Sequence, residues 1–89
     1  MKIKNGFMLR KVGGQHVVVA VGAASRDFNG IIKLNETGAF LWELLKSEHT
    51  AEELTEALLA EYDTDRETAA ADVAAFSEKL SRAELLDRG

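Results

Sequence analysis

Residues 34–45 contain the sequence LNETGAFLWELL, which predicts a sharp transition from a strand into a helix. Asn35 is a candidate N-cap, because its side chain can accept hydrogen bonds from the free backbone N–H groups of the next turn. Aromatic and leucine side chains then recur at helical spacing. They are Phe40, Leu41, Leu44 and Leu45. None of these side chains is a plausible nucleophile, base or metal ligand, so the junction itself carries no chemistry.

The sequence before the junction predicts three strands, at about 6–12, 15–21 and 31–34. Gly13-Gly14 can supply the positive φ angles of a tight hairpin between the first two. The second strand is rich in valine and apolar on both faces, which places it in the middle of the sheet. A polar loop follows, with turn chemistry at Asn29-Gly30, and leads to the short third strand, which we expect at an edge.

The sequence after the junction predicts three helices, at about 36–46, 51–62 and 66–83. Thr50 with Glu53, and Thr64 with Glu67, have the spacing of capping boxes at the starts of the second and third helices. The third helix is expected to begin after Thr64 or Asp65. Spacings of four and three residues give the third helix one apolar seam. The seam consists of Ala69, Val73, Phe76, Leu80 and Ala83. The prediction is one α+β domain over residues 1–89, winged-helix-like, with an antiparallel sheet followed by helices.

The net charge of −4 is unevenly distributed along the 89 residues. Residues 1–49 hold seven Lys and Arg against four Asp and Glu, whereas residues 50–89 hold four against eleven. The acidic second half would repel phosphate backbones, which disfavours nucleic acid as a partner. The chain has no cysteine, no apparent signal peptide and no apolar stretch of the roughly 20 residues that would span a bilayer. We therefore expect a cytoplasmic protein without a membrane partner.

The chain shows no pattern typical of catalysis, of a metal site or of a cofactor loop. His16 and His49 lack metal-ligand spacing, and no serine lies in a nucleophile elbow. Asp63 and Asp65 suggest a calcium loop, but its glycine and distal glutamate are missing, so helix capping is the better interpretation. We expect no enzyme activity, no cofactor and no metal.

Binding remains, and the edge strand suggests how it would occur. An edge strand has unpaired N–H and C=O groups with which a peptide can pair as an added strand. If the third helix packs beside that edge, the two form a groove. The candidate peptide-binding residues are Ile31, Ile32, Lys33, Leu34, Asp72, Ala75, Phe76 and Lys79. The alternative for Asp72 and Lys79 is that both are ordinary solvent-exposed charges.

The chain resembles the PqqD family, named for pyrroloquinoline quinone (PQQ) biosynthesis protein D. These small domains, also called RiPP recognition elements, accompany enzymes that modify ribosomally made peptides. The resemblance spans nearly the whole chain, and the order and spacing of its motifs carry it. The motifs are Phe28-Asn29-Gly30, Leu34-Asn35-Glu36-Thr37-Gly38 with Trp42 and Leu44-Leu45, Thr50-Ala51-Glu52-Glu53-Leu54, Tyr62-Asp63, Asp72-Val73 with Phe76 and Leu80, and Leu85-Leu86.

The resemblance implies a non-catalytic peptide chaperone of winged-helix-like fold. Such a domain captures the leader segment of a precursor peptide and presents it to a modifying enzyme, often a radical S-adenosylmethionine (SAM) enzyme. The leader would add as a strand along residues 31–34 and lie against the exposed side of residues 72–79. PQQ is one product among several that such a domain could serve.

Two other classes compete with this interpretation. A structural subunit of an enzyme complex would have the same ordinary solvated helix faces. A winged-helix DNA-binding module should have a basic recognition helix, but residues 65–84 hold three basic and five acidic side chains, which disfavours DNA.

Overall fold

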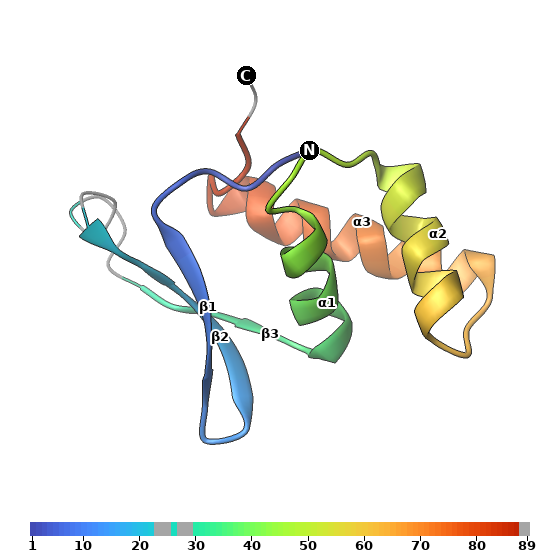
Figure 1. The fold of residues 1–89 in the computed structure, drawn as a ribbon, viewed down its shortest axis with the longest axis horizontal. Coiled ribbons are helices and arrows are strands. Elements are labelled where there is room, and N and C mark those ends of the chain that lie inside the picture. Colours follow the sequence, from blue (N-terminus) through green and yellow to red (C-terminus); the bar gives the residue numbers. More distant parts are fainter. Residues whose placement is uncertain (23–25, 27–29, 88–89) are drawn as a thin grey trace.

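The computed structural model describes residues 1–22, 26 and 30–87, and within them a three-stranded sheet precedes three helices (Figure 1). The strands are β1 (Phe7–Val12), β2 (Gln15–Ala20) and β3 (Ile32–Leu34). The helices are α1 (Glu36–Leu44), α2 (Ala51–Glu61) and α3 (Arg66–Arg82). The predicted α+β, winged-helix-like class is confirmed.

The sheet is antiparallel with the order β1-β2-β3, so the valine-rich strand lies in the middle as predicted. Gly13 and Gly14 connect β1 to β2 with φ angles of 57° and 81°. Two successive positive φ angles are typical of a type I′ hairpin turn, which glycine adopts without steric cost. Within the described residues β3 pairs with β2 alone, so it is an edge strand.

One face of the sheet is buried against the helices. Leu9, Val18 and Ile32 are neighbours across the three strands, so their side chains lie on the same face. Val18 is fully buried in the hydrophobic core, and the other two pack against it. Figure 1 shows the helices grouped on one side of the hairpin, with β3 leading directly into α1. The sheet therefore packs one face against the helices, and its β3 edge lies on the same side as the helices.

Asn35 caps α1 as predicted. Its Oδ1 atom accepts a hydrogen bond of 2.8 Å from the Gly38 backbone N–H and one of 3.0 Å from the Thr37 hydroxyl. A Cβ atom on Gly38 would lie 3.1 Å from that same Oδ1 and 3.3 Å from the Leu34 Cβ. The chain therefore turns from strand to helix tightly enough that glycine fits best at the third helical residue.

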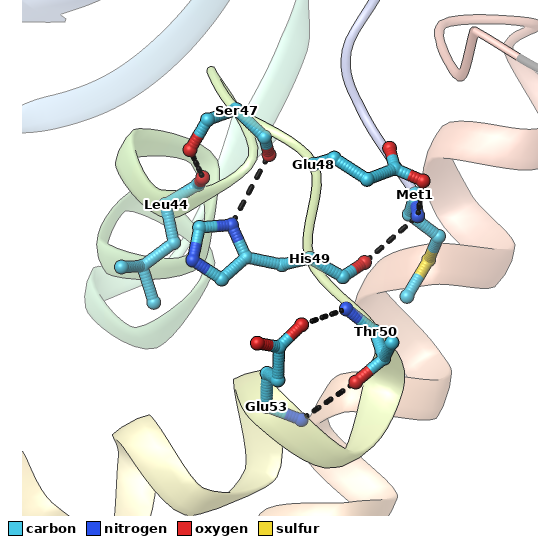
Figure 2. A network of polar contacts seen from close by, with 7 residues as sticks. All are labelled: Met1, Leu44, Ser47, Glu48, His49, Thr50 and Glu53. Carbon is cyan, nitrogen blue, oxygen red and sulfur yellow. Dashed lines mark hydrogen bonds and ion pairs between the residues drawn. The ribbon is translucent and has the colours of Figure 1, made fainter.

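Thr50 and Glu53 form the predicted capping box at the start of α2 (Figure 2). The Glu53 carboxylate accepts a 2.8 Å hydrogen bond from the Thr50 backbone N–H, which lowers the pKa of Glu53 below its ordinary value. In the same network, the Met1 amino group donates to the His49 carbonyl (2.7 Å) and to Glu48 (3.0 Å). The first residues of the chain are thus connected to the α1–α2 linker.

The capping box predicted at Thr64 and Glu67 is wrong. The N-cap of α3 is Asp65, whose carboxylate accepts a 2.7 Å hydrogen bond from the Thr68 backbone N–H. That bond lowers the pKa of Asp65. Aspartate is the stronger N-cap of two adjacent candidates, because a carboxylate interacts favourably with the positive end of the helix dipole.

The end of α3 is held by a Schellman motif. The Leu85 N–H bonds to the Leu80 carbonyl (2.9 Å) and the Glu84 N–H to the Ser81 carbonyl (3.1 Å). Glu84 has a φ angle of 60°, a left-handed conformation that glycine usually adopts at this position. Beyond it, Leu86 forms an isolated bridge with Ile3, so the segment after α3 pairs with the start of the chain.

The hydrophobic core combines side chains from the sheet, all three helices and both end segments. Trp42 is 1% exposed and belongs to the core. Four of the five residues in the predicted α3 seam are buried, and Ala83 at the C-cap is half-buried. The buried cluster is Ile3, Val18, Leu34, Leu41, Trp42, Leu45, Leu54, Leu58, Ala69, Val73, Phe76, Leu80, Leu85 and Leu86.

Several elements are shorter than the sequence predicts. Leu45 and Tyr62 are C-caps outside α1 and α2, and Ile31 precedes β3. Helix ends lose backbone partners over their last turn, so periodicity alone extends them too far. The predicted turn at Asn29 lies outside the described residues.

Candidate functional site

The free edge of β3 faces α3 across an open groove. The larger part of this groove is a hollow of about 660 Å³, lined by residues from both elements. Its lining consists of Ile31, Ile32, Lys33, Ala75, Glu78, Lys79, Arg82 and Ala83. Ile31 is 59% exposed and adds an apolar contact surface to the lining of the groove.

A second hollow of about 290 Å³ continues the groove toward the N-terminus of α1. It is lined by Leu34, Asn35, Thr37, Gly38, Asp72, Ala75, Phe76 and Lys79. Leu34 and Phe76 are buried core residues, at 8% and 6% exposed, so the wall of this hollow is the core itself. Both hollows share Ala75 and Lys79 on α3.

The eight residues that the sequence indicates for this groove all line these two hollows. Sequence reasoning missed the charged pair Glu78 and Arg82, and it missed Ala83. Arg82 lies seven residues after Ala75, and seven residues is two helical turns, so extending the helical spacing would have found it. The residues that α1 contributes, Thr37 and Gly38, had no such signal.

The Lys79 side chain crosses the groove. Its Nζ atom donates a 2.8 Å hydrogen bond to the Lys33 backbone carbonyl, so it connects α3 directly to β3. Because β3 has a neighbouring strand on one side only, this carbonyl is reached from the side of the free edge. Lys79 thus lines both hollows and binds the strand edge between α3 and β3.

The charges around the larger hollow are mainly positive. Among the described residues, Lys33, Lys79 and Arg82 line it, against one carboxylate, Glu78. Glu78 forms an ion pair of 2.7 Å with Arg82 on the same helix. The Asp72 carboxylate, half-buried at the smaller hollow, makes no side-chain hydrogen bond or ion pair within the described residues. The groove is therefore positive at the Ile31 end and carries a carboxylate at the other.

The described residues contain no group of three His, Cys, Asp or Glu side chains that could hold a metal ion. His49 lies far from the groove, in the α1–α2 linker, where its ring Nδ1 lies 3.1 Å from the Ser47 carbonyl. Within the same part of the chain, no helix is both long enough and apolar enough to cross a membrane.

A strand edge beside a helix can bind an extended segment of another chain. The edge provides backbone donors and acceptors, and the helix provides side chains that discriminate between sequences. The fold and this groove define a small winged-helix-like α+β domain with an open strand edge.

Comparisons with known proteins identify the family. The family model for coenzyme PQQ synthesis protein D (PqqD) matches residues 15–86, and the chain belongs to that family. No curated protein matches the chain significantly.

Two solved structures share the fold. One, described as TbiB1 in complex with the TbiA(beta) leader peptide, is 27% identical with a TM-score of 0.74. That match covers 100% of this chain and 98% of TbiB1. The other, a lasso peptide synthetase B1 complexed with the leader peptide, is 19% identical with a TM-score of 0.70. It covers 94% of this chain and 93% of that one, and at this identity it bears on the fold alone.

Proposed function

We propose that this protein is a non-catalytic peptide chaperone that binds the leader segment of a ribosomally made precursor peptide. The observation that carries the proposal is the free edge of β3, which faces α3 across a groove whose lining includes the exposed Ile31. Membership of the PqqD family supports it, as does the likeness to TbiB1, whose structure contains a leader peptide.

In the proposed complex, the leader adds as a fourth strand beside β3. Its backbone pairs with residues 31–34, and its side chains contact the α3 side of the groove through Asp72, Ala75 and Lys79. Phe76 contributes from the wall of the smaller hollow. Strand addition supplies affinity through main-chain hydrogen bonds, while the hollows select particular side chains.

The protein then presents the precursor to a modifying enzyme in the cytoplasm. A radical SAM enzyme is the partner we propose, with PQQ as one product class. Holding a flexible substrate near the active site raises its effective concentration, to the millimolar range for a short tether. Omitting the protein should slow modification of a full-length precursor far more than modification of a precursor without its leader.

A titration followed by NMR tests the binding site. The neighbouring reading frames are first searched for a short precursor peptide, and its synthetic N-terminal half is the probe. Backbone amides of residues 31–34 and 72–79 should shift together. Shifts confined to α2, around residues 52–59, would contradict the proposed groove.

A structural subunit of an enzyme complex is the competing function. Such a subunit would change the activity of its enzyme equally on full-length and leaderless precursors, so the omission assay separates the two. DNA binding is disfavoured because the exposed side of α3 includes Glu67 and Glu78 and carries no excess of cations.

A further inference from the structure

We infer that Lys79 selects an acidic side chain in the bound segment, because a strand that pairs with β3 must displace the Lys79 ammonium from the Lys33 carbonyl. The inference rests on the proposed function and specifies the chemistry of its ligand. It begins from the 2.8 Å hydrogen bond between Lys79 Nζ and Lys33 O.

The Lys33 carbonyl is an acceptor on the edge where an added strand would pair. Strand pairing places a backbone N–H of the incoming chain against such an oxygen, at about the same distance that Lys79 Nζ now has. The ammonium therefore fills the space that the incoming backbone needs. In the free protein it covers part of the exposed strand edge, a known way of protecting an edge from unwanted pairing.

The displaced ammonium stays close to the bound segment. Its four-carbon stem begins on α3, which forms the opposite wall of both hollows. A carboxylate on the incoming strand, on the helix-facing side that Ile32 and Leu34 share, could accept a charge-assisted hydrogen bond from it and replace the lost contact. An apolar or amide side chain at that position would leave the ammonium with water alone.

The other charges around the groove support an acidic ligand. Lys33 and Arg82 add to the positive charge of Lys79, and Glu78, the one carboxylate that lines the larger hollow in the described part of the chain, pairs with Arg82. This positive region lies on a chain with a net charge of −4. The cations that line the larger hollow therefore attract a carboxylate on the bound segment. The net negative charge of the whole chain repels acidic peptides that bind elsewhere.

A selection from a random library tests the inference without knowledge of the natural leader. Peptides of twelve random residues, displayed on their encoding mRNA, are selected against the full chain and against Lys79→Met and Lys79→Glu. Methionine keeps the length of the side chain and removes its charge and donor. Lys46→Met is the matched control. Lys46 is also exposed, but it forms an ion pair with Glu43 on α1 and does not line either hollow. Selected peptides are retained when they shift the amides of residues 32–34.

The wild-type protein and Lys46→Met should enrich Asp or Glu at one position of the aligned peptides. Lys79→Met should lose that enrichment, and Lys79→Glu should replace it with Lys or Arg. Replacing the enriched Asp or Glu by Asn or Gln should weaken binding about tenfold to the wild type and less than twofold to Lys79→Met.

Two outcomes overturn the inference in distinguishable ways. Peptides that bind at β3 with no single acidic position, or with one that persists in Lys79→Met, refute the role of Lys79 and leave the proposed function standing. If no selected peptide shifts residues 32–34 in any variant, strand addition is refuted, and the role of Lys79 falls with it.

Discussion

Replacing Phe76 with alanine should lower the free energy of unfolding by about 3–4 kcal/mol. Phe76 is 6% exposed and packs in the core beside Val73 and Leu80, which are 2% and 0% exposed. Truncating a buried phenylalanine costs ~3–5 kcal/mol through lost burial and the remaining cavity. Phe76 also lines the smaller hollow, so the new space would open to solvent on one side, which places the loss in the lower part of that range.

This loss is large for so small a protein. A domain of 89 residues has a total stability of roughly 4–13 kcal/mol at ~0.05–0.15 kcal/mol per residue. With a urea m-value of ~1.5 kcal/mol/M, the unfolding midpoint should fall by about 2–2.7 M, measured by far-UV circular dichroism. Phe76→Leu, which keeps most of the volume, should lose less than about 1.5 kcal/mol.

Lys79→Ala is the contrasting variant on the same helix. Lys79 is exposed, and its single hydrogen bond to Lys33 should contribute no more than about 1 kcal/mol. Its effect should appear in peptide affinity instead. Equal losses of stability in Phe76→Ala and Lys79→Ala would show that the two faces of α3 are wrongly assigned.

Three further predictions concern the ends of the helices. Asn35→Ala should cost about 1 kcal/mol in thermal unfolding, because the Gly38 N–H loses its acceptor, whereas Asn35→Asp should cost less. Glu84→Gly should raise the free energy of unfolding by about 0.5–1 kcal/mol, because Glu84 has a left-handed φ of 60° in which a Cβ atom is strained and glycine is not. A decrease would indicate that the Glu84 side chain has a stabilising contact. The lowered pKa values of Glu53 and Asp65 mean that each carboxylate adds stability when ionised, so this contribution is present at neutral pH and is lost as the pH falls below about 4. A double variant, Glu53→Gln with Asp65→Asn, should therefore show a flatter decline of the urea midpoint between about pH 5 and pH 3, and an unchanged slope would contradict the assignment.

The sequence by itself determined the features that depend on neighbours within a few positions. The N-cap at Asn35, the capping box at Thr50 and Glu53 and the hairpin at Gly13-Gly14 each use interactions across four residues or fewer. Such contacts are encoded locally, so residue type and spacing are sufficient to predict them. The apolar seam of α3 was predictable for the same reason, because helical geometry alone brings its members to one face.

Local competition limited even these predictions. Thr64 and Asp65 are adjacent and both suit an N-cap, and the sequence pattern favoured Thr64 through its spacing to Glu67. The N-cap is Asp65, one residue after Thr64, and its carboxylate accepts a hydrogen bond from the Thr68 N–H, so α3 begins at Arg66 as predicted. Thr and Asp differ only slightly in their free energy as N-caps. The packing of α3 therefore decides where the helix begins, and residue spacing could not choose between the two.

Only the tertiary structure decided what lies across the groove. Lys79 and Lys33 are 46 positions apart, and their hydrogen bond exists because α3 packs beside the edge of β3. The pairing of Ile3 with Leu86 joins the two ends of the chain in the same way. Sequence periodicity shows which side of a helix or strand is apolar. It does not determine which other element packs against that side, or the angle between the two elements. The contacts of an exposed side chain such as Lys79 depend on the neighbouring element and on that angle, so they are set only when the chain folds around its core.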